Sequence, residues 1–167
     1  MNRMKVTLRF VLPSDAEFVQ QYASYPEISE TSNVPYPYPD GAGESWAKMV
    51  MAKREQGISY VFTILFEDQF AGVMSLNAVD LTEKTAELDY WIAVPFWNRG
   101  IGTVAAQKAI DFAFHELDLQ ILRSACLVSN KGSLKVLEKN GFKKVNDFVF
   151  EDGKFKDKTG CRLELHR

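Results

Sequence analysis

The sequence is poor in the residues that build metal and redox sites. Among its 167 residues it has two cysteines, Cys126 and Cys161, and two histidines, His115 and His166. None of the four stands at a metal-ligand or redox spacing, so we expect no bound metal. Two lone thiols and the lack of a recognisable signal peptide predict a cytoplasmic protein.

Two further features are missing. No apolar run is long enough to cross a bilayer as a helix. The formal net charge is only −2, which gives no electrostatic reason to bind a polyanion. The lysines after Asn140 are interleaved with acidic residues, as on a solvated surface. We therefore expect neither a membrane nor a nucleic acid as a partner.

The composition that remains is that of one globular domain, with 46% apolar and 25% charged residues. Period-two alternation predicts a strand at residues 5–11. Strand-like runs joined by short polar links predict an antiparallel meander at residues 59–66, 70–79 and 85–94, followed by a short apolar strand at 121–128 and a terminal hairpin within residues 142–166. Period-3.6 patterns predict helices to about residue 24, over 44–56, over 100–117 and over 131–140. A capping box of Ser14 and Glu17 would begin the first helix. This order predicts a single α+β (mixed α/β) domain over residues 1–167.

The strongest chemical signal is the loop Trp97-Asn98-Arg99-Gly100-Ile101-Gly102-Thr103, between a strand and a long helix. Glycine allows a ligand close to the backbone, and the first N–H groups of a helix attract anions. Arg99 adds a positive charge. The loop therefore predicts a phosphate site. A turn that needs glycine to lead into a core helix explains the same residues equally well.

Two well-known phosphate motifs do not fit this loop. A Rossmann fingerprint needs a third glycine where Ala105 stands, and the strands that precede the loop are antiparallel rather than parallel. A P-loop needs a Gly-Lys-Ser/Thr sequence, which is absent.

The loop and a second motif resemble those of one known family. Arg99-Gly100-Ile101-Gly102 follows Glu87-Leu88-Asp89-Tyr90-Trp91-Ile92, and Asn130-Lys131-Gly132-Ser133 leads into Val136-Leu137-Glu138-Lys139-Asn140-Gly141-Phe142. These motifs resemble the GNAT N-acetyltransferase superfamily, and with the tyrosine–proline segment and Thr7-Leu8-Arg9 they resemble its RimJ/RimL-like type. The resemblance implies a mostly antiparallel twisted sheet of about seven strands with about four helices. It also implies transfer of an acetyl group from acetyl-CoA to an amine.

The same resemblance implies roles for individual residues. Backbone groups of Ile92 and Val94 would bind the pantetheine arm as an added strand. Amides from Arg99 to Thr103 (Arg99, Gly100, Ile101, Gly102 and Thr103) would hold the pyrophosphate. Asn130 would contact pantetheine, and Ser133 would lie beside the sulfur. The alternatives for the last two are a helix N-cap and an ordinary first-turn serine.

The sequence departs from the family pattern at two positions. Trp97 stands where the family often has Gln or Arg, which removes one polar contact. Asp89 stands where the RimJ/RimL type usually has glycine, so its carboxylate is expected to alter the acceptor site.

Candidate catalytic residues follow from the reaction. An attacking amine must lose a proton. Glu87 is our candidate base and Asp89 its competitor, because both share one face of the same strand. An N–H near Val94 would stabilise the oxyanion, and Ser133, or alternatively Tyr90, would donate to the leaving thiolate.

The acceptor side is less defined. Tyr36, Tyr38 and Trp46 lie in the irregular N-terminal third, where we expect an acceptor-binding wall or simply aromatic cover for the sheet. The acceptor is expected to be a peptide N-terminus or a small-molecule amine, and the chain a monomer or a homodimer. Two other functions remain open: a non-catalytic CoA-binding module on the same fold, and an unrelated nucleotide-binding domain.

Overall fold

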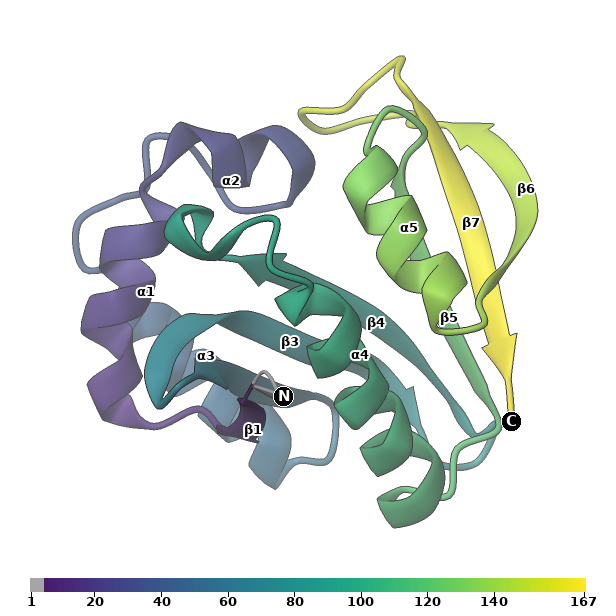
Figure 1. The fold of residues 1–167 in the computed structure, drawn as a ribbon, viewed down its shortest axis with the longest axis horizontal. Helices are drawn as coiled ribbons and strands as arrows, with labels where there is room; N and C mark the ends of the chain where they lie inside the picture. Colours follow the sequence, from purple (N-terminus) through teal and green to yellow (C-terminus); the bar gives the residue numbers. More distant parts are fainter. Residues whose placement is uncertain (1–4) are drawn as a thin grey trace.

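The computed structural model describes residues 5–167 and is shown in Figure 1. Its centre is one seven-stranded sheet in the order β1-β2-β3-β4-β5-β7-β6. The strands are β1 (Val6–Phe10), β2 (Tyr60–Phe66), β3 (Gln69–Asp80), β4 (Thr85–Ile92), β5 (Ile121–Leu127), β6 (Lys143–Val149) and β7 (Thr159–His166). Every pairing is antiparallel except that of β4 with β5. The predicted meander and terminal hairpin are both confirmed.

Five α-helices cover the two faces of this sheet. They are α1 (Ala16–Ala23), α2 (Pro26–Thr31), α3 (Ala42–Glu55), α4 (Ile101–Asp111) and α5 (Lys131–Lys139). A π-helical turn, Phe112–Glu116, extends α4. Helices α1 and α3 bury Val19, Ala47 and Val50 against β2 and β3. On the opposite face, α4 and α5 bury a larger apolar cluster. These two helices lie in front of the sheet in Figure 1.

The structure differs from the sequence expectation at the first helix. Ser14 is exposed within a 3-10 turn, Pro13–Asp15, and no side-chain cap begins α1 among the described residues. The capping box was therefore wrong. Asp15 is instead buried (2% exposed), because Arg9 and Thr63 of the neighbouring strands supply donors that draw the carboxylate toward the sheet.

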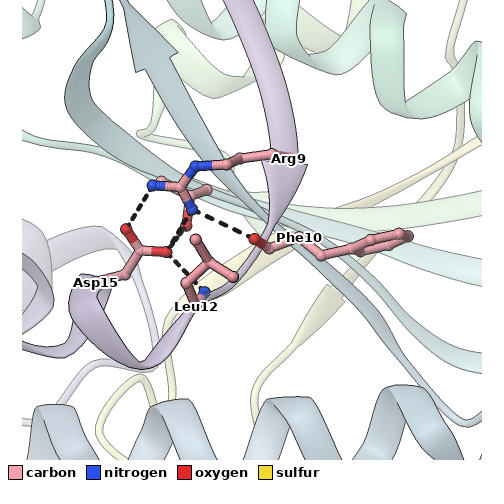
Figure 2. Close-up of polar contacts among 5 residues, drawn as sticks. Arg9, Phe10, Leu12 and Asp15 are labelled. Carbon is pink, nitrogen blue, oxygen red and sulfur yellow. Dashed lines mark hydrogen bonds and ion pairs between the residues drawn. The ribbon is translucent and has the colours of Figure 1, made fainter.

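The Asp15 carboxylate has four donors (Figure 2). Arg9 approaches it with both terminal nitrogens, at 2.7 and 2.9 Å. The Leu12 N–H donates at 2.8 Å and the Thr63 hydroxyl at 2.8 Å. A buried carboxylate is stable only when it is satisfied in this way. The ion pair thus joins β1, β2 and the start of α1.

Helix α2 was not anticipated. The sequence patterns predicted no helix between about residue 24 and residue 44, but α2 spans Pro26–Thr31. Its first residue is Pro26, whose fixed φ suits the first turn of a helix. Burial of Ile28 stabilises this short helix against the body of the protein. The irregular segment begins only after it.

Candidate active site

Strands β4 and β5 pair over only three positions and then separate. Their register runs from Thr85 opposite Ile121 to Glu87 opposite Arg123. Beyond this point the Ser124 hydroxyl, 2.7 Å from the Leu88 carbonyl oxygen, replaces a backbone partner. The two strands move apart toward the top of Figure 1, with α4 and α5 on the near side. The remaining part of β4 therefore has a free backbone edge.

The register with β3 shows which groups lie on that edge. Ile92 lies opposite Gly72 of β3. The next residue, Ala93, donates its N–H to the Ala71 carbonyl oxygen of β3 at 2.8 Å. Ile92 is thus a non-hydrogen-bonded position, and its own N–H and C=O point away from β3. By the same alternation, so do those of Tyr90. These groups face the split from β5, as the resemblance required of Ile92.

Val94 lies beyond the edge. β4 ends at Ile92, and Val94 begins a 3-10 turn, Val94–Phe96, in which its carbonyl accepts from the Trp97 N–H at 3.1 Å. The Trp97 indole then folds back, and its Nε1–H donates to the Ile92 carbonyl at 2.7 Å. Trp97 thus provides a polar contact at the position where we expected one to be lost.

Helix α4 begins directly after this turn. Gly100 is its N-cap residue with φ of 75°, in the left-handed region that glycine adopts without strain. Within residues 5–167 no side chain caps this end, so the N–H groups of Ile101, Gly102 and Thr103 have no intrahelical acceptor and point outward. Their orientation suits an anion.

Arg99 completes this helix end. Its guanidinium lies 5.8 Å from the ring centres of both Phe66 and Phe96, close enough for cation–π attraction. Arg99 is exposed and takes part in none of the ion pairs between residues 5 and 167. It therefore carries an uncompensated positive charge beside the open amides.

The second motif begins α5 on the other side of the split. Asn130 is the N-cap, and its Oδ1 accepts from the Ser133 N–H at 3.2 Å. The N-cap interpretation of Asn130 is therefore confirmed, while its side-chain amide N–H groups are not used in this bond. The Ser133 hydroxyl accepts from the Tyr90 hydroxyl at 3.2 Å. Tyr90, a secondary candidate in the sequence, thus lies with Ser133 on the α4–α5 face.

Burial affects the ionisation of this cluster. It raises the pKa of Tyr90, and the hydrogen bond with Ser133 only partly opposes the effect. Burial also raises the pKa of Cys126 to about 11, with a further contribution from Cys161, while the Ser133 hydroxyl acts in the opposite direction. At neutral pH the Tyr90 hydroxyl, the Cys126 thiol and the Ser133 hydroxyl are therefore all protonated and uncharged.

Glu87 and Asp89 point to the other face of β4. Both are exposed, and Asp89 accepts from the Asn77 side-chain amide at 3.0 Å. Trp91, the next residue on that face, packs with the α1–α3 cluster. The structure therefore brings Glu87 and Asp89 together but separates them from Ser133 by the thickness of the sheet. Only the split between β4 and β5 connects the two faces.

The N-terminal aromatic residues lie at different depths. Tyr36 is exposed, whereas Tyr38 and Trp46 are half-buried against the α1–α3 cluster, and burial raises the pKa of Tyr38. The sequence did not indicate that Lys154 of the β6–β7 loop contacts this region. Its Nζ donates to the carbonyls of Ser29 and Val34, at 2.6 and 2.7 Å.

Two features are absent from the described residues. No three His, Cys, Asp or Glu side chains within residues 5–167 are grouped so that they could hold a metal ion. In the same part of the chain, every helix is too short or too polar to cross a membrane.

Comparison with known proteins identifies the family. A model described as the acetyltransferase (GNAT) domain matches residues 5–143. The chain belongs to the GNAT acetyltransferase family. The predicted family is thereby confirmed.

Individual relatives refine this assignment. The putative ribosomal N-acetyltransferase YdaF of Bacillus subtilis is 36% identical over 94 residues, which are 56% of this chain and 48% of YdaF. The match thus spans about half of that relative. The solved structure of RimL, a ribosomal L7/L12 alpha-N-protein acetyltransferase in complex with coenzyme A, has a TM-score of 0.90 at 18% identity, over 96% of this chain and 93% of RimL. The predicted likeness to the RimJ/RimL type is confirmed.

A second solved structure has the same fold. The spermidine N-acetyltransferase of Vibrio cholerae, in complex with CoA and spermine, has a TM-score of 0.83 at 18% identity and covers 96% of this chain and 95% of that protein. At this identity the likeness shows the fold alone. One fold therefore carries acceptors as different as a ribosomal protein and a polyamine in other members.

Proposed function

We propose that this chain is an acetyl-CoA-dependent N-acetyltransferase that acetylates a primary amine. The observation that carries the proposal is the split between β4 and β5. It combines a free backbone edge at Tyr90 and Ile92 with the open N-terminus of α4 at one end and Ser133 at its side. These three features match, in order, the extended amide chain, the pyrophosphate and the thioester of acetyl-CoA.

The donor half of the site binds through backbone groups and one positive charge. The pantetheine arm pairs with the edge of β4 in the manner of an added strand. The pyrophosphate lies against the amides of Ile101, Gly102 and Thr103, with Arg99 beside it. Asn130, whose Oδ1 accepts from the Ser133 N–H in the helix cap, can donate its side-chain N–H groups to a pantetheine carbonyl.

The catalytic half divides between the two faces of β4. Glu87 takes the proton of the attacking amine from the exposed face, directly or through a water, with Asp89 as its competitor. A backbone N–H near Val94 stabilises the oxyanion. On the opposite face, Ser133 donates to the departing thiolate. Because Tyr90 donates to Ser133, the hydrogen of the serine hydroxyl remains available for the sulfur.

The acceptor is a protein N-terminal α-amine or a small-molecule amine. The likeness to YdaF and RimL favours a ribosomal-protein N-terminus, and the polyamine acetyltransferase keeps small amines open. The exposed carboxylates of Glu87 and Asp89 suit a cationic acceptor of either kind. Tyr36 and Tyr38 lie on the segment that we assign to the acceptor wall. We also propose a cytoplasmic enzyme that acts as a monomer or a homodimer.

The first test measures binding. Acetyl-CoA at a hundredfold excess over its Kd should stabilise the native state by about 2.7 kcal/mol, which raises the Tm by several degrees for a chain of this length. ATP and NAD should leave the Tm unchanged. A shift with ATP or NAD and none with acetyl-CoA would instead identify an unrelated nucleotide-binding domain.

The second test measures transfer. Release of free CoA thiol is followed with ribosomal-protein N-terminal peptides, polyamines and aminoglycosides as acceptors. Glu87→Gln should lower kcat and change its pH profile, whereas Glu83→Gln, an exposed acid in the turn before β4, should not. Acetyl-CoA binding without thiol release for any acceptor would favour the non-catalytic CoA-binding module.

A further inference from the structure

Trp97 connects the two parts of the donor site. Its backbone N–H bonds to the Val94 carbonyl at 3.1 Å, and its indole N–H bonds to the Ile92 carbonyl at 2.7 Å. The backbone contact closes the turn that leads to α4. The indole contact joins the same residue to the end of β4. The side chain is 41% exposed, so burial in the core does not explain its position.

The indole occupies one group on the free edge of β4. Of the groups that face the split, the carbonyl of Ile92 is the last before the 3-10 turn. A chain that added to this edge would otherwise use it as an acceptor. With the carbonyl occupied, the described residues leave the N–H of Ile92 and both backbone groups of Tyr90 available. Because the indole ring also stands in front of this carbonyl, an added strand would end at Ile92.

We propose that Trp97 is a positioning residue that sets the register of the acyl donor on β4. The inference rests on the proposed function. By holding the Ile92 carbonyl, the indole prevents the pantetheine arm from sliding to the next set of backbone groups on this edge. Because these groups recur at every second residue, such a slip is about 7 Å and would displace the thioester from Ser133. Displacements of about 1 Å at a reacting atom are enough to cost on the order of a hundredfold in rate.

Trp97→Phe tests the bond with the ring retained. Loss of one hydrogen bond from the site should raise the Kd of acetyl-CoA roughly fivefold to tenfold and lower kcat by at least as much. The KM of the amine should not change. The 3′-phosphoadenosine diphosphate half of CoA, which lacks the pantetheine arm, should bind within about twofold of wild type, because it contacts only the helix end. Trp46→Phe is the matched control for loss of an indole and should leave both Kd values unchanged.

Trp97→Gln separates the effect of the hydrogen bond from the effect of the size of the ring. It removes the ring but keeps a side-chain N–H donor, so it should restore acetyl-CoA binding and kcat more fully than Trp97→Phe. A merely structural role for Trp97 predicts the reverse order. It also predicts that acetyl-CoA and the nucleotide half weaken together in Trp97→Phe. Either result would overturn the inference.

A measurement on the wild-type protein needs a variant only to assign one resonance. The indole N–H resonance of Trp97, assigned by its loss in Trp97→Phe, should exchange slowly with solvent before and after acetyl-CoA binds. Rapid exchange in the complex would mean that the ligand displaces the indole, and the inference would be wrong. If the wild-type protein binds no acetyl-CoA, the proposed function fails together with this inference. If the wild type binds acetyl-CoA and the Trp97 variants have the same Kd and kcat as the wild type, only this inference fails.

Discussion

The hydroxyl of Tyr90 donates to the hydroxyl of Ser133 across 3.2 Å and so connects the middle of β4 with the first turn of α5. The two residues are 43 positions apart in the sequence. The bond orients Ser133, whose backbone N–H is held by the Asn130 cap. It also leaves the serine hydrogen free to point at the split between β4 and β5. In the proposed mechanism a weak acid such as serine suffices, because it needs only to donate a hydrogen bond to a thiolate and not to transfer a proton.

Ser133→Ala should therefore lower kcat by roughly tenfold to hundredfold, the value of a hydrogen bond to a charged group, with little change in acetyl-CoA affinity. Tyr90→Phe should have a smaller effect, because it only frees the serine to rotate. The double variant should be no slower than Ser133→Ala alone, since the two residues act as a unit. Steady-state kinetics with the best acceptor decides the point. Full activity of Ser133→Ala would remove the serine from the mechanism.

Replacement by alanine should affect stability differently at Gly100 and at Gly102, although both glycines belong to the same motif. Gly100 has φ of 75°, so Gly100→Ala should lower the free energy of unfolding by about 1–2 kcal/mol. At Gly102 an added Cβ would lie 3.5 Å from Tyr90 and Val136, an ordinary contact. Gly102→Ala should therefore be as stable as wild type. Urea denaturation of both variants measures the difference, and equal stabilities would contradict the left-handed conformation at Gly100.

The Arg9–Asp15 pair should make stability depend on acid pH. Burial by itself raises the pKa of Asp15, but the donors of Arg9, Leu12 and Thr63 outweigh it and lower the pKa overall. A carboxyl whose pKa is lower in the folded state stabilises the fold above its unfolded pKa, near 3.8, and this contribution disappears as the pH falls through the folded value. Asp15→Asn should lower the free energy of unfolding by about 2 kcal/mol at pH 7. The difference in this free energy between variant and wild type should become smaller below about pH 4.

Asp68 provides the control for this prediction. Its ion pair with Lys5, at 3.2 Å, is solvent-exposed. Asp68→Asn should therefore change the free energy of unfolding by less than about 0.5 kcal/mol at any pH. A gap for Asp15→Asn that stays constant from pH 7 to pH 3 would show that the carboxylate charge contributes nothing.

Cys126 should react slowly with alkylating reagents. The thiolate is the nucleophile, and burial raises the pKa of this thiol from 9.0 to about 11. Below pH 9 its alkylation should be about a hundredfold slower than that of a thiol of ordinary pKa and should rise about tenfold per pH unit. Mass spectrometry of iodoacetamide-treated native and urea-unfolded protein measures both rates. Rapid labelling of native Cys126 at pH 7 would be inconsistent with its burial beside Ser133.

Local patterns in the sequence were sufficient for the elements and for the family. Strand-like runs joined by short polar links predicted the three strands from Ser59 to Val94 to within about two residues of the strands found. Of these, β4 buries alternate side chains, whereas β2 and β3 bury consecutive residues because helices cover both of their faces. Gly100 and Gly141 marked a helix start and a helix end because these positions have φ of 75° and 90°. The capping box failed because Asp15 has stronger partners in Arg9 and Thr63, and Thr63 is 48 residues away.

By itself, the sequence therefore determined the order of strands and helices, the glycine at the start of α4 and the membership of the GNAT family, all of which depend on local patterns of residues. Only the tertiary structure decided that β4 separates from β5 after Glu87, that Tyr90 meets Ser133, and that Glu87 lies on the opposite face. It also decided that the Trp97 indole closes the Ile92 edge. Each of these depends on how the strands twist apart and where distant side chains meet, and no local periodicity encodes that.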